Sequence, residues 1–246
     1  ERKSGVSLST LGFGRGNFND HMMERLADAG NGNYSFIDSL AEGRKVLAQQ
    51  ASSTLHTVAK DVKVQVEFNP THLREYRLLG YENRALRRED FKNDHVDAGE
   101  VGAGTTVTAL YELTPSGAPS SAEPLRYVQD KIEQAIGTRF ESELAFLRIR
   151  YKSPSGETSK LLEIPIAKPA MVRSFDRASD DLRFASAVAG FAQLLRQSDD
   201  IGKLSFRDIR TIAAESRGQD EFGYRRDFVK LVDEAAALRI ETEQTE

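Results

Sequence analysis

Hydrophobic and polar positions in the first 56 residues follow an order of strand, helix, strand and helix. Apolar and polar residues alternate from Gly5 to Leu11, and apolar residues recur at helical spacing between Asn19 and Ala29. Tyr34–Ile37 is predicted as a short strand, followed by a longer helix that Asp38 or Ser39 caps. The apolar residues that this helix directs toward a core are Leu40, Val46, Leu47, Ala51 and Leu55. This order predicts parallel strands joined by crossover helices.

Two strands and two helices do not complete a doubly wound sheet, because buried parallel strands need neighbours on both sides. Two interpretations stay open. The segment either packs as an edge on the rest of this chain, or it is the last part of a domain whose beginning lies before Glu1.

From Val58 onward, apolar and polar residues alternate with a period of two. Val62, Val64, Val66 and Phe68 point one way, and the charged and polar residues between them point the other way. Further strands are predicted at 73–81, 105–113, 144–151 and 161–166. A proline-containing loop over 114–124 and a short helix over 125–136 separate them. This part predicts an antiparallel β-sandwich or open barrel.

The last part of the chain is helical. A wide apolar stripe predicts a buried helix over 175–196, and Ser205 with Asp208 predicts a capping box at the start of the next, which ends at Glu215. A third helix is predicted from Asp220 to about Leu238, before an acidic tail. The predicted fold class is α/β plus α+β, with domains at 1–56, 57–172 and 173–246.

The composition of the chain excludes several classes of function. The 246 residues hold 34 basic and 38 acidic side chains, a formal charge of -4, which gives no electrostatic footprint for nucleic acid. There is no cysteine, which excludes a disulfide scaffold, a thiolate nucleophile and a cysteine-ligated metal in this chain. No apolar run approaches the length of a membrane span. The start at Glu1 lacks a methionine and a signal core, so the chain is expected to be a processed or trimmed product.

Three glycines, Gly12, Gly14 and Gly16, lie between a predicted strand and a predicted helix. Such a loop suits a phosphate, since bare amides at a helix N-terminus attract anions. The spacing fails the dinucleotide fingerprint, because its third glycine would fall at Asn17, and Asp38 alone offers the acidic residue after the next strand. A tight strand-to-helix turn is the favoured interpretation.

Histidines and carboxylates are the candidate metal ligands and catalytic groups of the sequence. The four histidines, His21, His56, His72 and His95, do not pair at helical spacing. A carboxylate-rich segment contains Glu89, Asp90, Asp94, Asp97 and Glu100. Calcium would suit these oxygens, but the EF-hand order is lacking. A solvated loop paired with Arg84, Arg87 and Arg88 is favoured, and Tyr76 and Tyr81 are expected to pack within strands.

Several phrases together resemble the bacterial von Willebrand factor A-domain proteins, often lipoproteins, in which the A domain precedes a characteristic C-terminal region. They are Leu11–Gly14, Asn19–Asp20, Leu26–Asp28, Gly30–Tyr34, Asp61–Pro70, Arg77–Arg84, Glu89–Phe91, Val96–Gly104 and Thr106–Leu113. The resemblance resumes at Glu143–Lys152, Lys160–Pro165, Phe184–Arg196 and Tyr224–Ala235, whereas 126–142 look like an insertion.

The resemblance implies that Gly5 to about Leu55 form the end of a doubly wound A domain. Its metal-ion-dependent adhesion motif is expected upstream of Glu1, so no catalytic, cofactor or metal residue is assigned in this chain. The family implies a divalent cation, usually Mg²⁺, bridged to a carboxylate of a protein partner. It also implies a location at the cell envelope or in the periplasm, with a lipid anchor upstream.

The leading hypothesis is therefore a non-enzymatic protein-interaction and scaffold module. Two alternatives stay open. The first is a hydrolase in which two or more of His95, Asp97, Glu100 and Glu112 converge only in the fold. The second is a structural protein associated with the cell envelope.

Overall fold

A computed structural model describes residues 7–14, 19–80, 85–118, 140–168, 171–198 and 202–243. The chain divides into two compact units. Unit 1 comprises Glu1–Glu67, Arg84–Val107 and Ala145–Pro165, and unit 2 comprises Phe68–Asn83, Thr108–Leu144 and Ile166–Glu246. Each unit is described by itself.

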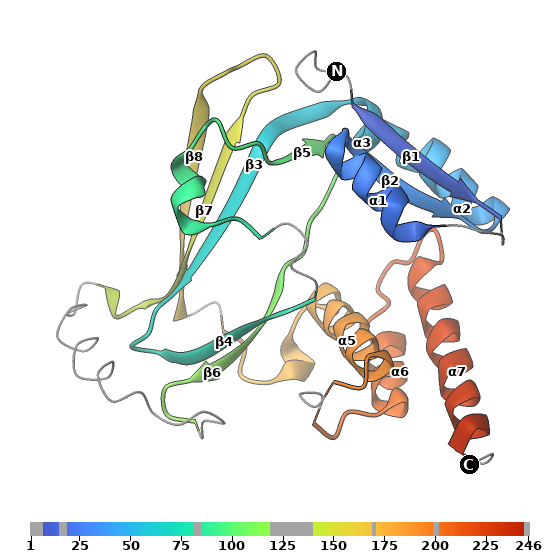
Figure 1. Ribbon diagram of the computed structural model, residues 1–246. Coiled ribbons are helices and arrows are strands. Elements are labelled where there is room, and N and C mark those ends of the chain that lie inside the picture. The colour runs from blue at the N-terminus through green and yellow to red at the C-terminus, as the bar shows by residue number, and fades with distance from the viewer. Residues whose placement is uncertain are drawn as a thin grey trace. The chain divides into compact units, whose positions relative to one another are not determined.

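Unit 1 begins with a parallel strand pair joined by a helix (Figure 1). Strand β1 (Leu8–Phe13) pairs in parallel with β2 (Asn31–Ile37), and helix α1 (Asp20–Ala29) packs against both strands. The Asn19 side chain caps α1 by accepting a hydrogen bond from the Met22 amide at 3.0 Å. The predicted strand, helix and strand are confirmed here, with β2 starting three residues earlier than expected.

The helix expected over 39–55 is interrupted. Ser39 caps α2 (Leu40–Arg44), a π-helical turn follows over Lys45–Gln49, and α3 spans Ala51–Leu55. None of these three elements contains a buried residue. The expectation that Leu40, Leu47 and Leu55 point into a core is therefore wrong for the described part of the chain, where all three are exposed.

A four-stranded sheet forms the rest of unit 1, in the order β5-β3-β7-β8. The strands are β3 (Thr57–Phe68), β5 (Gly99–Gly102), β7 (Glu143–Lys152) and β8 (Ser159–Ala167), of which β3, β7 and β8 extend by one or two residues into unit 2. Strand β5 pairs antiparallel with β3. A 3₁₀ turn at Arg88–Lys92 precedes β5, and the sequence pattern predicted neither of these two elements.

In unit 2, β4 (Leu73–Leu79) pairs antiparallel with β6 (Leu110–Pro115). Tyr76 lies opposite Leu113, and Arg77 lies opposite Glu112 in this pairing. The ring of Phe68 contacts both Tyr76 and Tyr111, with centroids 4.6 and 5.1 Å apart. The strand expected from Thr105 begins at Leu110 instead.

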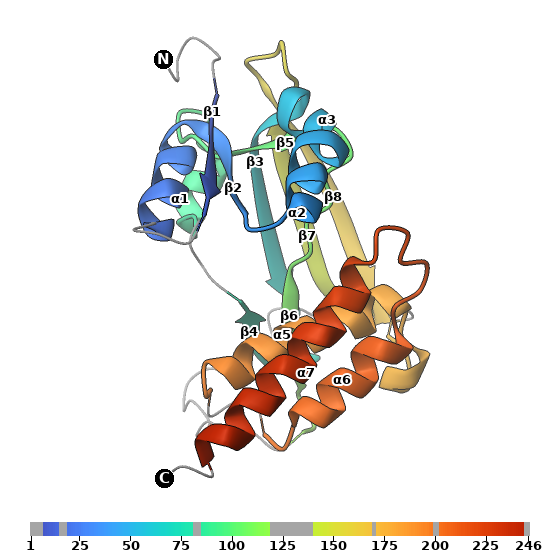
Figure 2. The ribbon, with the colours of Figure 1, turned by 90° about the vertical axis from the view of Figure 1, so that its right-hand side faces the viewer.

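Three helices build the core of unit 2, and Figure 2 shows them side by side. A 3₁₀ turn at Phe175–Arg177 precedes α5 (Asp180–Leu195), α6 (Phe206–Glu215) and α7 (Tyr224–Glu243). Their buried core consists of Ala187, Phe191, Leu194, Ile209, Ala213 and Val232. The predicted capping box of Ser205 and Asp208 is confirmed, with each side chain accepting a hydrogen bond from the other residue's amide.

The mixed α/β character predicted from the sequence is confirmed. The described strands form sheets of two, four and two strands. The domain limits at 56 and 172 and the sandwich packing stay predictions, and the helix expected over 125–136 lies outside the described residues. Across the described helices, none combines the length and the apolar character that crossing a membrane requires.

Candidate functional site

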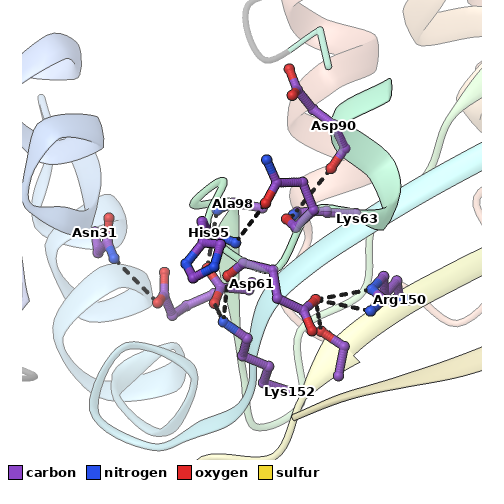
Figure 3. A network of polar contacts seen from close by, with 12 residues as sticks. Asn31, Asp61, Lys63, Asp90, His95, Ala98, Arg150 and Lys152 are labelled. Carbon is purple, nitrogen blue, oxygen red and sulfur yellow. Dashed lines mark hydrogen bonds and ion pairs between the residues drawn. The ribbon is translucent and has the colours of Figure 1, made fainter. Parts of the chain in front are cut away.

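Charged side chains of unit 1 gather where the segment 88–98 lies on one face of the four-stranded sheet (Figure 3). Strand β3 contributes Asp61 and Lys63, and β7 contributes Arg150 and Lys152. Because side chains alternate across a strand, residues two apart share a face. The sheet therefore presents a row of charges to the segment that covers it.

Asp94 is at the centre of this network. Its Oδ1 atom accepts hydrogen bonds from Ser159 Oγ at 2.5 Å and from Arg150 Nε at 3.1 Å, and Arg150 Nη2 lies 3.0 Å away. The Ser159 hydroxyl, aided by Arg150, holds the pKa of the Asp94 carboxyl below its usual range. The ionised carboxylate thus fastens the segment to β7 and β8.

Asp61 and Lys152 make a second pair in the same network. Lys152 Nζ donates to Asp61 Oδ2 at 2.7 Å and to the Asp94 carbonyl at 3.0 Å. The other oxygen of Asp61 accepts the Ala98 amide at 3.2 Å. Asp61 has a positive φ of 50°, at a place where the β3–β5 register shifts. Its strained backbone aims the carboxylate at both partners.

Lys63 is buried beneath the segment, with 3% of its surface exposed. Its ammonium donates to the carbonyls of Asp90 at 3.3 Å and Asn93 at 2.5 Å. Burial lowers the pKa of Lys63, partly offset by Asp61 and Asp94. Arg87 holds Asp90 by a hydrogen bond of 2.8 Å from its Nε atom.

These contacts bear on the carboxylate-rich segment noted in the sequence. Its local pairing is confirmed for Arg87, which lies 2.8 Å from Asp90 and 3.6 Å from Glu89. Arg84 lies outside the described residues. Arg150 and Ser159 were not predicted as site residues, although the alternate basic positions 148, 150 and 152 indicate one charged strand face. Within the described residues, no three histidine or acidic side chains come together to hold a metal ion.

Three other candidate residues make hydrogen bonds within their own units. Glu100 accepts a hydrogen bond from Asn31 at 3.2 Å, and the His95 amide donates to Asn93 Oδ1 at 3.0 Å, both in unit 1. Glu112 belongs to unit 2, where it accepts from Arg77 Nε at 3.1 Å.

Some of the remaining candidates lie in the described residues. Gly14 follows β1 directly with φ +88°, a backbone conformation that favours glycine, while Gly16 lies outside the described residues. His72 Nε2 lies 2.6 Å from the carbonyl of Glu141. Tyr76 is exposed, although its ring contacts Phe68, and Tyr81 lies outside the described residues.

The α/β part of unit 1, residues 7–55, leaves large apolar side chains exposed. The exposed fractions are 62% for Phe13, 83% for Leu40 and 76% for Leu55. Further exposed apolar residues in this part are Leu8, Leu11, Met22, Leu26, Phe36 and Leu47. Nine large apolar side chains are thus exposed in the described residues of this part.

Comparisons with known proteins agree with the resemblance seen in the sequence. A family model described as "Uncharacterized protein YfbK, C-terminal" matches residues 53–238. The chain is 47% identical over 234 residues to a protein described as "Uncharacterized protein YfbK" from Escherichia coli (strain K12), covering 95% of this chain and 39% of the relative. The chain thus spans about two fifths of the length of that relative.

Two solved structures show a looser likeness. One is the ArnB paralog VWA2 from Sulfolobus acidocaldarius, with a TM-score of 0.43 and 11% identity over 89% of this chain and 50% of that one. The other is a von Willebrand factor type A protein from Catenulispora acidiphila, with a TM-score of 0.37 and 12% identity over 92% and 52%. These TM-scores are too low to superpose individual residues.

Proposed function

The chain belongs to the family of the YfbK C-terminal region, and from this premise we propose that it is a non-enzymatic interaction and scaffold module of a larger von Willebrand factor A-domain protein. The observation that carries the proposal is the exposed apolar surface of residues 7–55. Apolar side chains such as Leu40 and Leu55 are stabilised when another protein surface removes them from water.

The charges of unit 1 support the same proposal. The carboxylates of Asp61 and Asp94 are engaged by Lys152, Arg150 and Ser159. Such charge-assisted hydrogen bonds fasten a segment to a sheet. This network is a structural fastening in our proposal.

The finer architecture belongs to this proposal as well. Residues 7–55 are the end of a doubly wound sheet, which further parallel strands complete at the open edge of β1. The parallel β1–β2 pair with its crossover helix α1 supports this assignment. The β-rich region then follows as a sandwich-like layer, and α5, α6 and α7 form a helical subdomain.

Metal-dependent binding lies upstream of this chain in our proposal, where Mg²⁺ or another divalent cation bridges to a carboxylate of a protein partner. The location at the cell envelope and the upstream lipid anchor follow from the resemblance alone. Fractionation of the intact protein, with and without detergent, tests these two points.

In-cell crosslinking of the intact, tagged protein tests the interaction function. We expect at least one protein to be captured saturably, and capture to fall when a chelator removes divalent cations. The tag alone is the control. Failure to capture any protein above this control, with Mg²⁺ present or removed, contradicts the proposal.

A further inference from the structure

A polar hollow lies between the end of α6 and the start of α7, within unit 2. Its volume is about 450 Å³, and its lining residues are Ala214, Glu215, Arg217, Gly218, Asp220, Gly223 and Arg226. The hollow is large enough for a carboxylate together with part of the chain that carries it.

The two acidic residues of the hollow are already engaged. Glu215 Oε2 accepts a hydrogen bond from Arg183 Nη2 at 2.9 Å. Asp220 accepts the amides of Arg225 and Arg226 at 3.1 and 2.9 Å, so its carboxylate caps the start of α7. Among the described residues, neither carboxylate makes a hydrogen bond with the guanidinium group of Arg217 or Arg226.

Arg217 and Arg226 keep most of their donors available. Arg217 Nε donates to the Ala214 carbonyl at 3.3 Å, and Arg226 Nε lies 3.9 Å from Asp227 Oδ1. Across the residues that the structure describes, the terminal Nη atoms of these two arginines make no hydrogen bond. Two guanidinium groups beside one hollow are suited to holding a carboxylate, since each offers paired donors.

Gly223 shapes the hollow around Arg226. It is buried with φ +76°, and a Cβ atom there would lie 2.7 Å from Arg226 Nη2. The guanidinium therefore lies directly over the glycine backbone. The neighbours of Gly223 are aromatic: Phe222 is 53% exposed and Tyr224 is 39% exposed, with ring centroids 5.7 Å apart.

We propose that this hollow binds an acidic segment of a partner protein, with Arg217 and Arg226 contacting a carboxylate and Phe222 contacting an apolar side chain next to it. The inference rests on the proposed interaction function and names the chemistry of one partner. A single carboxylate fits better than a polyanion, because Glu215 and Asp220 also line the hollow and the chain carries a net charge of -4.

Nuclear magnetic resonance titration of the ¹⁵N-labelled 246-residue chain tests the proposal. The probe is a blocked peptide, Ser-Glu-Asp-Leu-Phe-Gly, and its matched control replaces the acidic residues by glutamine and asparagine. We expect saturable shifts of the Gly218 and Gly223 amides, and an affinity for the acidic peptide about tenfold above that for the neutral one.

The double variant Arg217→Gln, Arg226→Gln is expected to bind the acidic peptide about tenfold more weakly. Arg207→Gln, an exposed change on α6 outside the hollow, is the control and is expected to alter affinity less than about twofold. Unchanged spectral dispersion shows that each variant is folded.

Three outcomes overturn the proposal: no saturable shift at Gly218 and Gly223, equal affinity for both peptides, or tighter binding of inorganic phosphate than of the acidic peptide. Crosslinking separates this proposal from the proposed function. If the double variant still captures a partner to the same extent, the hollow is not the binding site, although the proposed interaction function is retained. A complete lack of captured protein removes the interaction function itself.

Discussion

Asp94 is fastened by residues that are distant in the sequence. Ser159 and Arg150 donate to its carboxylate, while Lys152 donates to its backbone carbonyl. The adjacent Lys63 holds the carbonyls of Asp90 and Asn93 from below. The position of the 88–98 segment thus depends on a few ionised groups, and its stability depends on pH.

Asp94→Asn removes the charge that Arg150 and Ser159 stabilise. Because the pKa of Asp94 is lowered in the folded state, its stabilising contribution is fully present above the unfolded pKa of about 3.9 and is lost as pH falls through the lowered value. We expect the variant to melt below the wild type at pH 7, and the difference to shrink below about pH 4.

Thermal denaturation across pH 2–7, followed by circular dichroism, is the measurement for Asp94→Asn, with the pH range set by ordinary carboxyl titration, about pH 4. Asp38→Asn, an exposed change between β2 and α2, is the control and is expected to leave the melting temperature unchanged. A difference between wild type and Asp94→Asn that stays constant with pH would mean that shape, and not charge, causes it.

At the scale of elements, nearby residues were sufficient to predict a helix or strand wherever they themselves supply the group that stabilises it. Capping residues predicted three helix starts correctly, and the structure assigns the caps to Asn19 and Ser39, where Asp20 and Asp38 were the alternatives, and to Ser205. The capping hydrogen bond is made within four residues. Regular alternation likewise predicted β3, and the strand predicted over 144–151 coincides with β7. Both signals can be identified in the sequence without knowing the rest of the fold.

Elements that depend on distant partners escaped prediction. Strand β5 has four residues, two of them glycine, and no alternating pattern, so its pairing with β3 gave no local signal. The Asp94 contacts with Arg150 and Ser159 require β7 to lie beside β3 and β8 to lie beside β7, a sheet order that periodicity does not encode. The carboxylate cluster could therefore be predicted from the sequence, whereas the hydrogen-bond network around it could not.

Ser205→Ala tests the capping box at the start of α6. The serine side chain accepts the Asp208 amide, and its loss is expected to cost about 1 kcal/mol of unfolding free energy. Urea denaturation measures the change. Ser205→Asp, which keeps an acceptor at the cap, is expected to retain most of the stability. Equal losses in both variants would argue that the cap contributes nothing.

Gly102→Ala tests the close approach of α3 and β5. A Cβ atom at position 102 would lie 1.6 Å from the Ser53 carbonyl oxygen, so backbone must move apart. We expect a loss of about 1–3 kcal/mol in unfolding free energy, measured in urea. Gly117→Ala meets no atom within 4 Å and is expected to change stability by less than about 0.5 kcal/mol. A neutral Gly102→Ala would contradict this packing of α3 on β5.

At the scale of the whole molecule, apolar burial is distributed unevenly. The helices of unit 2 share a contiguous buried core around Ile209 and Val232. In the described residues of the α/β part, the buried side chains are Thr10, Ala27 and Ile37. A strand pair with so little burial is marginal in water, so its stability depends on what covers its exposed apolar residues.

The double variant Leu40→Glu, Leu55→Glu shows whether further chain covers this surface. In the 246-residue chain both positions are exposed, and we expect the unfolding free energy to change by less than about 1 kcal/mol in total. In a chain that carries the additional region of its longer relatives, we expect a loss of about 2–4 kcal/mol, because each substitution leaves a carboxylate buried without a partner. Leu195→Glu, an exposed change on α5, is the matched control and is expected to be neutral in both chains. Denaturation of the two chains side by side makes the comparison, and a double variant that is neutral in both would mean that no further part of the protein packs on α2 and α3.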